Sequence, residues 1–121
     1  MKEYRLVIAG CRDYNNYFRL SQEVKKYIKS LGENYSIIII SGGASGADAL
    51  GEKFAKKHKL QVERYPAEWD KYGKFAGPRR NAQMAKAADA VIVFWDGKSR
   101  GTKNMIECAK KENKPYKIIE I

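Results

Sequence analysis

The sequence predicts an α/β fold, a three-layer sandwich of helices around a five-stranded parallel sheet. Residues 37–40 and 90–95 are unbroken apolar runs, as expected of central strands that are buried on both faces. A glycine-rich segment follows each run, and a stretch with apolar residues at helical spacing follows each of these segments. Strands and helices therefore alternate along the chain, which is the pattern of a parallel sheet.

Composition is typical of a globular protein with a single domain over residues 1–121. Of these residues 44% are hydrophobic and 12% aromatic, and the chain is too short for two cores. No stretch reaches the roughly 18 apolar residues of a membrane span and no signal peptide is recognisable, so we expect a cytoplasmic protein that does not engage a membrane. Cys11, Cys108 and the single His58 are too few for a zinc site, which predicts free thiols and no metal.

The formal net charge of +10 fits a nucleic-acid ligand, an anionic small molecule or solubility alone. Most lysines fall on helix positions that face away from the apolar stripes, as on a solvated surface. Four arginines differ, because they fall in predicted loops or helix starts beside glycines, where a guanidinium can grip phosphate. These are Arg12, Arg79, Arg80 and Arg100.

The first half of the chain predicts three strands and two helices. Gly32 stops the first helix, and Asn15, Asn16 or Ser21 caps its start. The third strand alternates polar and apolar residues, as an edge strand does, and ends at Pro66. In order, we expect strand 4–9, a helix over 20–31, strand 37–40, a helix over 47–58 and strand 60–65.

The second half begins with the longest irregular stretch, residues 66–77, which carries Trp69, Tyr72 and Phe75. Either this loop is functional or its rings simply pack onto the body of the domain. Pro78 opens the next helix, since the first turn needs no N–H from it. Strand 90–95, loop 96–102, a helix with Met105 and Ile106, and strand 116–121 complete five strands and four helices.

A Rossmann-like strand order, 3-2-1-4-5, brings the unusual residues together. In such a sheet ligands bind outside the carboxyl ends of the strands, where the winding reverses. We expect the helices after the first and fourth strands to share one face and those after the second and third to share the other. The segments that follow the first four strands, and that should form one crevice, are 10–13, 41–48, 66–81 and 96–102.

This crevice is predicted to bind a phosphorylated ligand. Backbone N–H groups of the two glycine-rich loops would cradle phosphate. Arg12 and Arg80 would neutralise its charge. In a nucleotide, Asp13 and Asn81 would bond ribose or base edges, and Trp69 or Tyr72 could stack on a base. The candidate ligand-binding residues are Gly10, Cys11, Arg12, Asp13, Ser41, Gly42, Gly43, Ser45, Gly46, Asp48, Trp69, Arg79, Arg80, Asn81, Asp96, Gly97, Ser99, Gly101 and Thr102.

Three of these residues have alternative interpretations, and no catalytic residue is assigned. Asp13 and Asp48 are conceivable acids or bases, and Asp48 could equally cap or charge the first turn of its helix. Cys11 is a conceivable nucleophile, but the only histidine is remote in sequence, which favours a small loop residue.

Four motifs together resemble the SLOG superfamily. That group joins the nucleotide-binding core of the DNA-processing protein A (Smf) family with the cytokinin-activating LOG phosphoribohydrolases, and the chain is similar to its small stand-alone YspA/YpsA-related branch. The motifs are Ala9-Gly10-Cys11-Arg12-Asp13, Ser41-Gly42-Gly43-Ala44-Ser45-Gly46-Ala47-Asp48, Gly77-Pro78-Arg79-Arg80-Asn81 with Met84, and Ser99-Arg100-Gly101-Thr102.

The resemblance implies a nucleotide or nucleotide-derived ligand, ADP-ribose-like for this branch, that is sensed or sequestered. LOG enzymes carry Pro-Gly-Gly-x-Gly-Thr-x-x-Glu after the fourth strand, and the position of that glutamate is Met105 here. Glu107 lies two residues on, about 200° further round the helix. The alternative functions are a LOG-like phosphoribohydrolase or other N-glycosidic hydrolase, and a single-stranded nucleic-acid binding domain that uses basic and aromatic residues of 71–79.

We also expect a homodimer or a higher homo-oligomer. The helix over 80–88 is short and alanine-rich, and its Met84, Ala85 and Ala88 allow another element to approach closely. Phe54, Met105 and Tyr116 are expected near apolar surface that the chain itself covers incompletely. Isologous dimers are the commonest arrangement, and the junction is predicted near residues 69–75.

Overall fold

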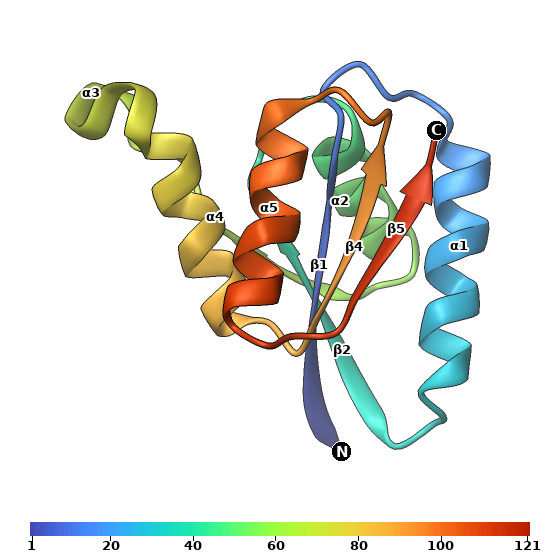
Figure 1. The fold of residues 1–121 in the computed structure, drawn as a ribbon. Coiled ribbons are helices and arrows are strands. Elements are labelled where there is room, and N and C mark those ends of the chain that lie inside the picture. The colour runs from blue at the N-terminus through green and yellow to red at the C-terminus, as the bar shows by residue number, and fades with distance from the viewer.

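The computed structural model describes residues 1–121 and confirms the predicted Rossmann-like α/β fold. All five strands are parallel, in the order β3-β2-β1-β4-β5 (Figure 1). Each predicted strand is present, with ends that shift by at most two residues. In chain order the elements are β1 (Lys2–Gly10), α1 (Tyr17–Ser30), β2 (Tyr35–Ser41), α2 (Ala47–Lys57), β3 (Gln61–Arg64), α3 (Trp69–Tyr72), a 3₁₀ turn (Gly73–Phe75), α4 (Ala76–Ala87), β4 (Ala90–Trp95), α5 (Arg100–Lys111) and β5 (Tyr116–Glu120).

Helices α1 and α2 pack on one face of the sheet, and α4 and α5 pack on the other (Figure 1). This corrects the predicted pairing of helices. Right-handed crossovers from β1 to β2 and from β2 to β3 move in one direction, so they share a face, whereas the connections to β4 and β5 move back and use the other face. Phe54 and Met105 are buried in these two cores, contrary to expectation, and only Tyr116 of the three predicted residues is exposed.

Residues 69–87 are almost entirely helical, which corrects the predicted irregular stretch and gives five α-helices instead of four. Gly73 ends α3, but the chain continues at once through the 3₁₀ turn into α4, and Pro78 does not interrupt α4. Gly73 adopts a φ of 55° as the C-cap of α3, and Pro78 is the third residue of α4, where the N–H group has no helical partner to lose. α3 has no buried residue and, with the start of α4, projects away from the sheet (Figure 1).

The ends of α1 follow the predicted capping chemistry. Asn16 is the N-cap, and its side chain accepts a hydrogen bond from the Arg19 N–H at 3.0 Å. Ser21, an alternative cap, lies inside the helix and is buried. After Leu31, Gly32 turns the chain with a φ of 86°.

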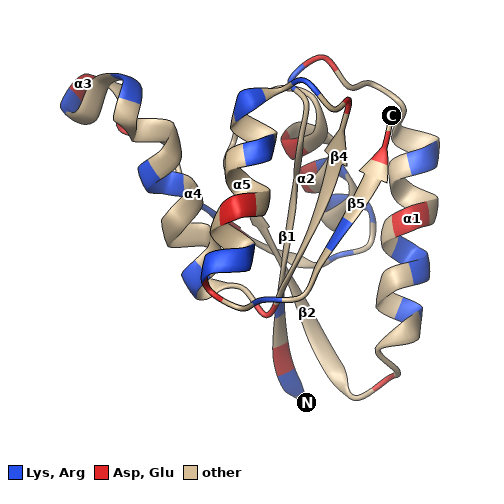
Figure 2. Cartoon of the chain, viewed as in Figure 1, with Lys and Arg blue, Asp and Glu red and all other residues tan.

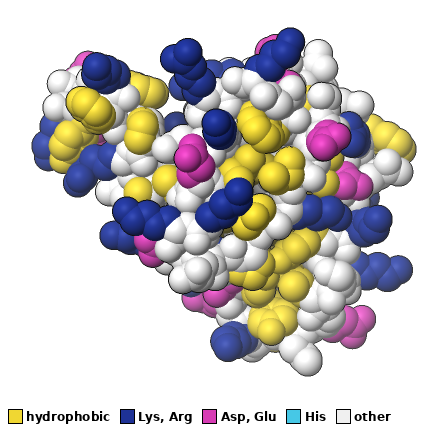
Figure 3. All heavy atoms as spheres, viewed as in Figure 1, with side chains coloured by type: hydrophobic (Ala, Val, Ile, Leu, Met, Phe, Trp, Pro, Cys, Tyr) yellow, Lys and Arg dark blue, Asp and Glu magenta, His cyan; other side chains and the backbone are white.

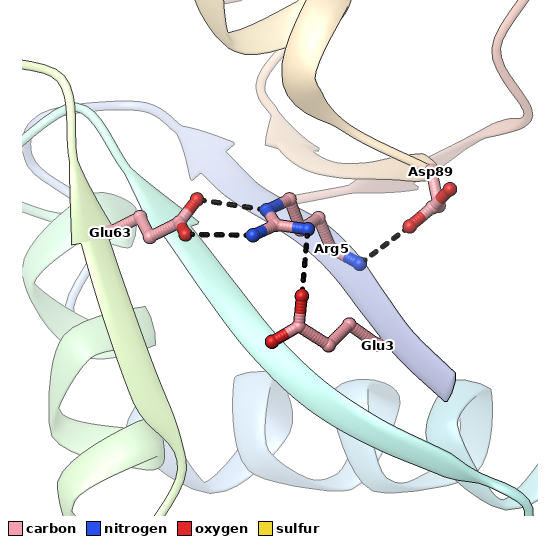
Figure 4. Close-up of polar contacts among 4 residues, drawn as sticks. All are labelled: Glu3, Arg5, Glu63 and Asp89. Carbon is pink, nitrogen blue, oxygen red and sulfur yellow. Dashed lines mark hydrogen bonds and ion pairs between the residues drawn. The ribbon is translucent and has the colours of Figure 1, made fainter. Parts of the chain in front are cut away.

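A cluster of charged residues centred on Arg5 ties the amino-terminal parts of the strands together (Figure 4). The Arg5 guanidinium reaches from β1 to Glu63 of β3, donating from Nε and Nη2 to the two carboxylate oxygens at 3.1 Å each. It also donates to Glu3, and the Arg5 N–H donates to Asp89 at 2.8 Å, just before β4. The edge strand β3 is therefore held to β1 across β2.

Charged side chains are distributed over the outer surfaces of the helices. Lysines and arginines occur on α1, α3, α4 and α5 rather than in one continuous stripe (Figure 2). Because it is spread in this way, the positive charge does not by itself mark one binding face.

None of the helices has the length and apolarity that a membrane span would need.

Candidate functional site

Two adjoining cavities open at the carboxyl edge of the sheet. The inner cavity, about 270 Å³, is lined by Ala9, Gly10, Arg12, Ala44, Asp48, Trp69, Gly77, Pro78, Arg80, Asn81, Met84, Arg100, Gly101, Thr102, Asn104 and Met105. The outer cavity, about 550 Å³, is lined by Arg12, Gly42, Gly43, Ala44, Ser45, Ala49, Glu52, Arg64, Pro66, Ala67, Trp69 and Arg80. We call the four residues that line both cavities the waist. They are Arg12, Ala44, Trp69 and Arg80.

Arg80 is the buried cation of the waist, only 8% exposed. Its Nη1 donates to the Gly42 carbonyl at 2.6 Å and its Nε donates to Asn81 Oδ1 at 3.0 Å. No carboxylate forms an ion pair with it. Burial lowers the pKa of Arg80, and the Arg12 charge lowers it further while Asp48 opposes this. A buried guanidinium without an ion pair is costly, and an anion bound at the waist would offset that cost.

Asp48 is the only carboxylate in the lining of the inner cavity, and it is 5% exposed. Its Oδ2 accepts a hydrogen bond from the Ala44 N–H at 3.3 Å. Gly42 lies between Asp48 and Arg80, since a Cβ there would be 2.8 Å from Asp48 Oδ2 and closer still to Arg80 Nη1. Burial raises the pKa of Asp48 to about 6, against the opposing effects of the Ala44 N–H and Arg80. Asp48 could therefore carry or release a proton near neutral pH.

The raised pKa predicts that Asp48→Asn stabilises the domain at neutral pH. The native state binds this proton more tightly than the unfolded chain, so the associated stability is complete below pH 3.8 and is lost as the pH rises through about 6. At pH 7.5 the variant should gain about 1 to 3 kcal/mol in free energy of unfolding, and the gain should shrink towards pH 4. Urea denaturation at both pH values measures it. An equal gain at both would contradict the raised pKa.

The glycine-rich loop uses several of its own donors. The Gly43 N–H, a predicted phosphate donor, donates to Ser41 Oγ at 3.1 Å. The N–H groups of Ala44 and Ala47 also have acceptors within the protein, and Ser45 Oγ donates to the Arg12 carbonyl at 3.1 Å. Three backbone N–H groups of the loop are therefore already used within the protein.

Gly43→Val should remove ligand binding and leave a folded domain. Gly43 lines the outer cavity, and no atom lies within 4 Å of the position of a Cβ there. Its φ of 75° means that a side chain would cost about 1 to 2 kcal/mol. Circular dichroism checks that the variant is folded, and calorimetric titration with ADP-ribose measures its binding. Undiminished binding by the folded variant would contradict a ligand in the outer cavity.

A hydrogen-bonded network on the outer cavity was not predicted from the sequence. Ser41 Oγ donates to Glu52 Oε2 at 2.6 Å, and Arg64 Nε donates to Glu52 Oε1 at 2.9 Å. Burial opposes ionisation of Glu52, but the hydrogen bonds from Arg64 and Ser41 prevail and lower its pKa. Glu52 follows Asp48 by one helical turn, which was the one available signal that it faces the same loop.

The first residues of the segment 96–102 form a turn that caps α5, and its last residues line the inner cavity. Asp96 Oδ1 accepts from the N–H groups of Lys98 and Ser99 at 2.8 and 2.9 Å, and these bonds lower the pKa of Asp96. Ser99 Oγ caps α5 by accepting from the Thr102 N–H at 3.3 Å. Of the predicted residues here, Gly101 and Thr102 line the inner cavity. Asp96, Gly97 and Ser99 line neither cavity.

Asn81 positions Arg80 and joins α4 to α5. Its Oδ1 accepts from Arg80, while its Nδ2 donates to Asn104 Oδ1 at 2.9 Å and to the Gly101 carbonyl at 3.3 Å. Asn81 therefore lines the inner cavity with its polar atoms already partnered within the protein. To contact ribose as predicted, Asn81 would have to exchange one of these hydrogen bonds or add the ligand as a further partner.

Trp69 is the aromatic residue that reaches the site. It is half exposed, and the Arg12 guanidinium carbon lies 6.0 Å from the centre of its ring. Arg79 instead lies 4.4 Å from the ring centre of Tyr72, on the projecting segment. The predicted residues that line neither cavity, besides Asp96, Gly97 and Ser99, are Cys11, Asp13, Ser41, Gly46 and Arg79.

Neither cysteine is placed for catalysis. Both are free thiols, and Cys11 is 2% exposed. Burial raises the pKa of the Cys11 thiol, so it stays protonated and is a poor nucleophile. No cluster of three or more His, Cys, Asp or Glu side chains could hold a metal ion.

Several lining residues were missed because they carry no distinctive chemistry in sequence. Most are small or apolar, and Gly77 and Pro78 lie in the predicted segment 66–81 although neither was assigned to the site. Arg100 stood out among the arginines but was not assigned to the site. The unpredicted residues are Ala9, Ala44, Gly77, Pro78, Met84, Arg100, Asn104 and Met105 in the inner cavity and Ala49, Glu52, Arg64, Pro66 and Ala67 in the outer one.

Comparison with known proteins identifies the family. The model of the YspA, cpYpsA-related SLOG family matches residues 4–72, more than half of the chain. The Gene 61 protein of Mycobacterium phage D29 is 33% identical over 87 residues, which cover 67% of this chain and 70% of that protein.

The X-ray structure of DNA processing protein A from Streptococcus pneumoniae has the same fold, with a TM-score of 0.74 and 20% sequence identity. The similarity covers 99% of this chain and 51% of that one, so the chain spans about half the length of that protein. The fold, the motifs around the two cavities and the family match agree. The chain belongs to the YspA, cpYpsA-related SLOG family.

Proposed function

We propose that the protein binds a nucleotide-derived ligand whose anionic group lies at the waist, between the two cavities. The observation that supports this most directly is the buried Arg80 guanidinium, which lines both cavities and has no ion pair. Arg12 adds a second cation at the same point. Two adjacent guanidiniums favour a phosphate or pyrophosphate over a neutral group.

The two cavities suit different parts of such a ligand. The inner one presents apolar surface from Met84, Met105 and Trp69, which favours a base. The outer one presents Glu52 and Arg64, which favour a polar, hydroxylated group. A base, a central anion and a sugar together describe an ADP-ribose-like ligand, and the protein would sense or sequester it.

Hydrolysis of an N-glycosidic bond is the alternative, and the lining residues favour binding over it. Met105, at the position of the LOG glutamate, is buried against the inner cavity. Glu107 is exposed and lines neither cavity. Asp48 is then the only carboxylate of the inner cavity available for proton transfer.

A nucleic-acid ligand is favoured by one separate observation. The projecting segment pairs rings with cations, with Lys74 Nζ 5.5 Å from the ring centre of Phe75 and Lys71 Nζ 5.2 Å from that of Tyr72. Exposed rings beside cations can stack on unpaired bases. Single-stranded DNA bound there would lose affinity with salt at a log–log slope of about −0.7 per phosphate contacted, whereas a nucleotide in the cavities should show a shallower slope.

Isothermal titration calorimetry with ADP-ribose, AMP and adenosine at one salt concentration tests the proposal. ADP-ribose should bind at least about 10-fold more tightly than AMP, the scale of one hydrogen bond to a charged group, and adenosine should bind weakest. Adenosine affinity equal to that of AMP would contradict an anion at the waist. Absence of binding by all three at millimolar concentration would contradict the proposed ligand class.

A further inference from the structure

Strand β5 forms an open edge of the sheet, and its α5 side carries two exposed apolar residues, Tyr116 and Ile118. Tyr116 and Ile118 are 42% and 38% exposed, and their partners on β4 belong to the core beneath α4 and α5. Trp95, Ile118 and Ile121 help to line a hollow of about 320 Å³ beside this edge. Figure 3 shows apolar side chains gathered on this face, in the region of α5 and β5. The chain itself covers β5 incompletely.

Alternate residues of β5 also present unpaired backbone groups. The Val91 N–H donates to the Pro115 carbonyl at 3.0 Å, and the Ile121 N–H donates to the Trp95 carbonyl at 3.1 Å. The odd-numbered residues of β5 therefore point their backbone groups towards β4, and the even-numbered residues point theirs outward. The residues that direct both N–H and C=O away from the sheet are Tyr116, Ile118 and Glu120.

The opposite edge of the sheet is protected. β3 has only four residues. Its Glu63 is held by Arg5 through two hydrogen bonds, and its Arg64 is held by Glu52. β5 also carries two charged residues, Lys117 and Glu120, but its Tyr116 and Ile118 are exposed on the α5 side. Charged edges resist pairing with other strands, whereas exposed apolar residues beside free backbone groups favour it. The two edges thus differ in what they can bind.

We propose that β5 pairs antiparallel with β5 of a second copy of this chain, about a two-fold axis at Ile118. In this register Ile118 faces Ile118 of the second copy, and Tyr116 faces Glu120 of the second copy. These are the positions whose N–H and C=O groups point outward, so each facing pair exchanges two hydrogen bonds. The two sheets become one continuous sheet, and the exposed Tyr116 and Ile118 side chains gain cover.

In this register Lys110 of one copy lies near Glu120 of the other. This opposite charge favours a second copy of the chain over a strand of another protein. Lys110 Nζ lies 5.7 Å from the ring centre of Tyr116 on the α5 side. Facing residues of an antiparallel pair have Cβ atoms about 5 Å apart. Glu120 of the second copy, facing Tyr116, is therefore within reach of Lys110. The two-fold axis repeats this pair, as an isologous interface requires.

Sedimentation velocity across about 1 to 100 µM tests the interface with Ile118→Lys. Wild type should form a dimer. The variant places two lysines face to face on the axis, so its dimer dissociation constant should rise at least about 100-fold. Glu120→Lys should also weaken the dimer, and the double variant Lys110→Glu/Glu120→Lys should restore it. Because these three residues are at the surface, thermal melting should show folded variants.

Three results would overturn the proposal. The first is wild type that sediments as a single 13.8 kDa species throughout. The second is a dimer that Ile118→Lys and Glu120→Lys leave unchanged. The third comes from Phe75→Lys, a control at a 66% exposed position on the projecting segment, where the sequence predicts the junction. Dissociation by Phe75→Lys, with Ile118→Lys still dimeric, would place the interface on that segment instead.

Discussion

Arg80→Ala is expected to weaken the binding of ADP-ribose about 10- to 150-fold, which corresponds to 1.5 to 3 kcal/mol, the usual range for hydrogen bonds to a charged group. The guanidinium is buried at the waist, between the two cavities, and its position is fixed by Gly42 and Asn81. Its contacts with an anion therefore need little reorganisation. Calorimetric titration of the folded variant measures the loss.

Two variants sharpen this test. Arg80→Lys keeps the charge but loses the planar fork, so it should recover only part of the affinity. Arg79→Ala is the matched control, because Arg79 is the preceding residue on α4 and its guanidinium lies over Tyr72, outside both cavities. Affinity should be unchanged in this control. Equal affinities for wild type, Arg80→Ala and Arg80→Lys would show that the ligand does not contact Arg80.

Gly46→Ala is expected to lower the free energy of unfolding by at least about 3 kcal/mol, through combined strain and overpacking. Gly46 has φ 75° and ψ −130°, a region that is almost closed to residues with a Cβ. A Cβ there would lie 2.5 Å from the Arg12 carbonyl oxygen and closer still to that of Cys11. These are backbone atoms that cannot move aside. Urea denaturation measures the loss.

Gly43→Ala is the matched control for this prediction. Gly43 has the same φ of 75°, but nothing lies within 4 Å of the position of its Cβ. It should therefore lose only about 1 to 2 kcal/mol, the cost of the backbone conformation. Similar losses for the two alanine variants would contradict the close contact between Gly46 and the 11–12 backbone.

The sheet could be predicted because its physical signals are local. Unbroken apolar runs at 37–40 and 90–95 belong to central strands, and the charged, alternating run at 60–65 belongs to an edge. The face on which each helix packs depends on the direction of each crossover across the whole sheet, and the predicted pairing of helices was wrong. Residues 69–77 were not predicted as helical, because α3 has only four residues and ends at Gly73, which is too short for a recognisable helical repeat of apolar residues.

The sequence predicts which segments lie at the site, but not which of their side chains point into it. Arg12 and Arg80 follow from the convergence of segments at the carboxyl ends of the strands. Side-chain direction does not follow from this convergence. Neither the separation of Arg79 from Arg80 nor the contact of Gly46 with its own chain, rather than with a ligand, was therefore predictable. Glu52 and Met84 line the cavities because of the way α2 and α4 pack on the sheet, which a helical pattern alone does not specify.

A two-dimensional ¹H–¹⁵N NMR titration of the ¹⁵N-labelled chain with ADP-ribose tests the ligand site most directly. A ligand at the waist should shift the backbone amides of Gly42, Gly43 and Ala44 and the side-chain Nε–H signals of Arg12 and Arg80. The amides on the lysine-bearing outer faces of α1 and α2 should stay in place. Shifts confined to those outer faces, or to the projecting segment 69–75, would contradict a nucleotide site between the two cavities.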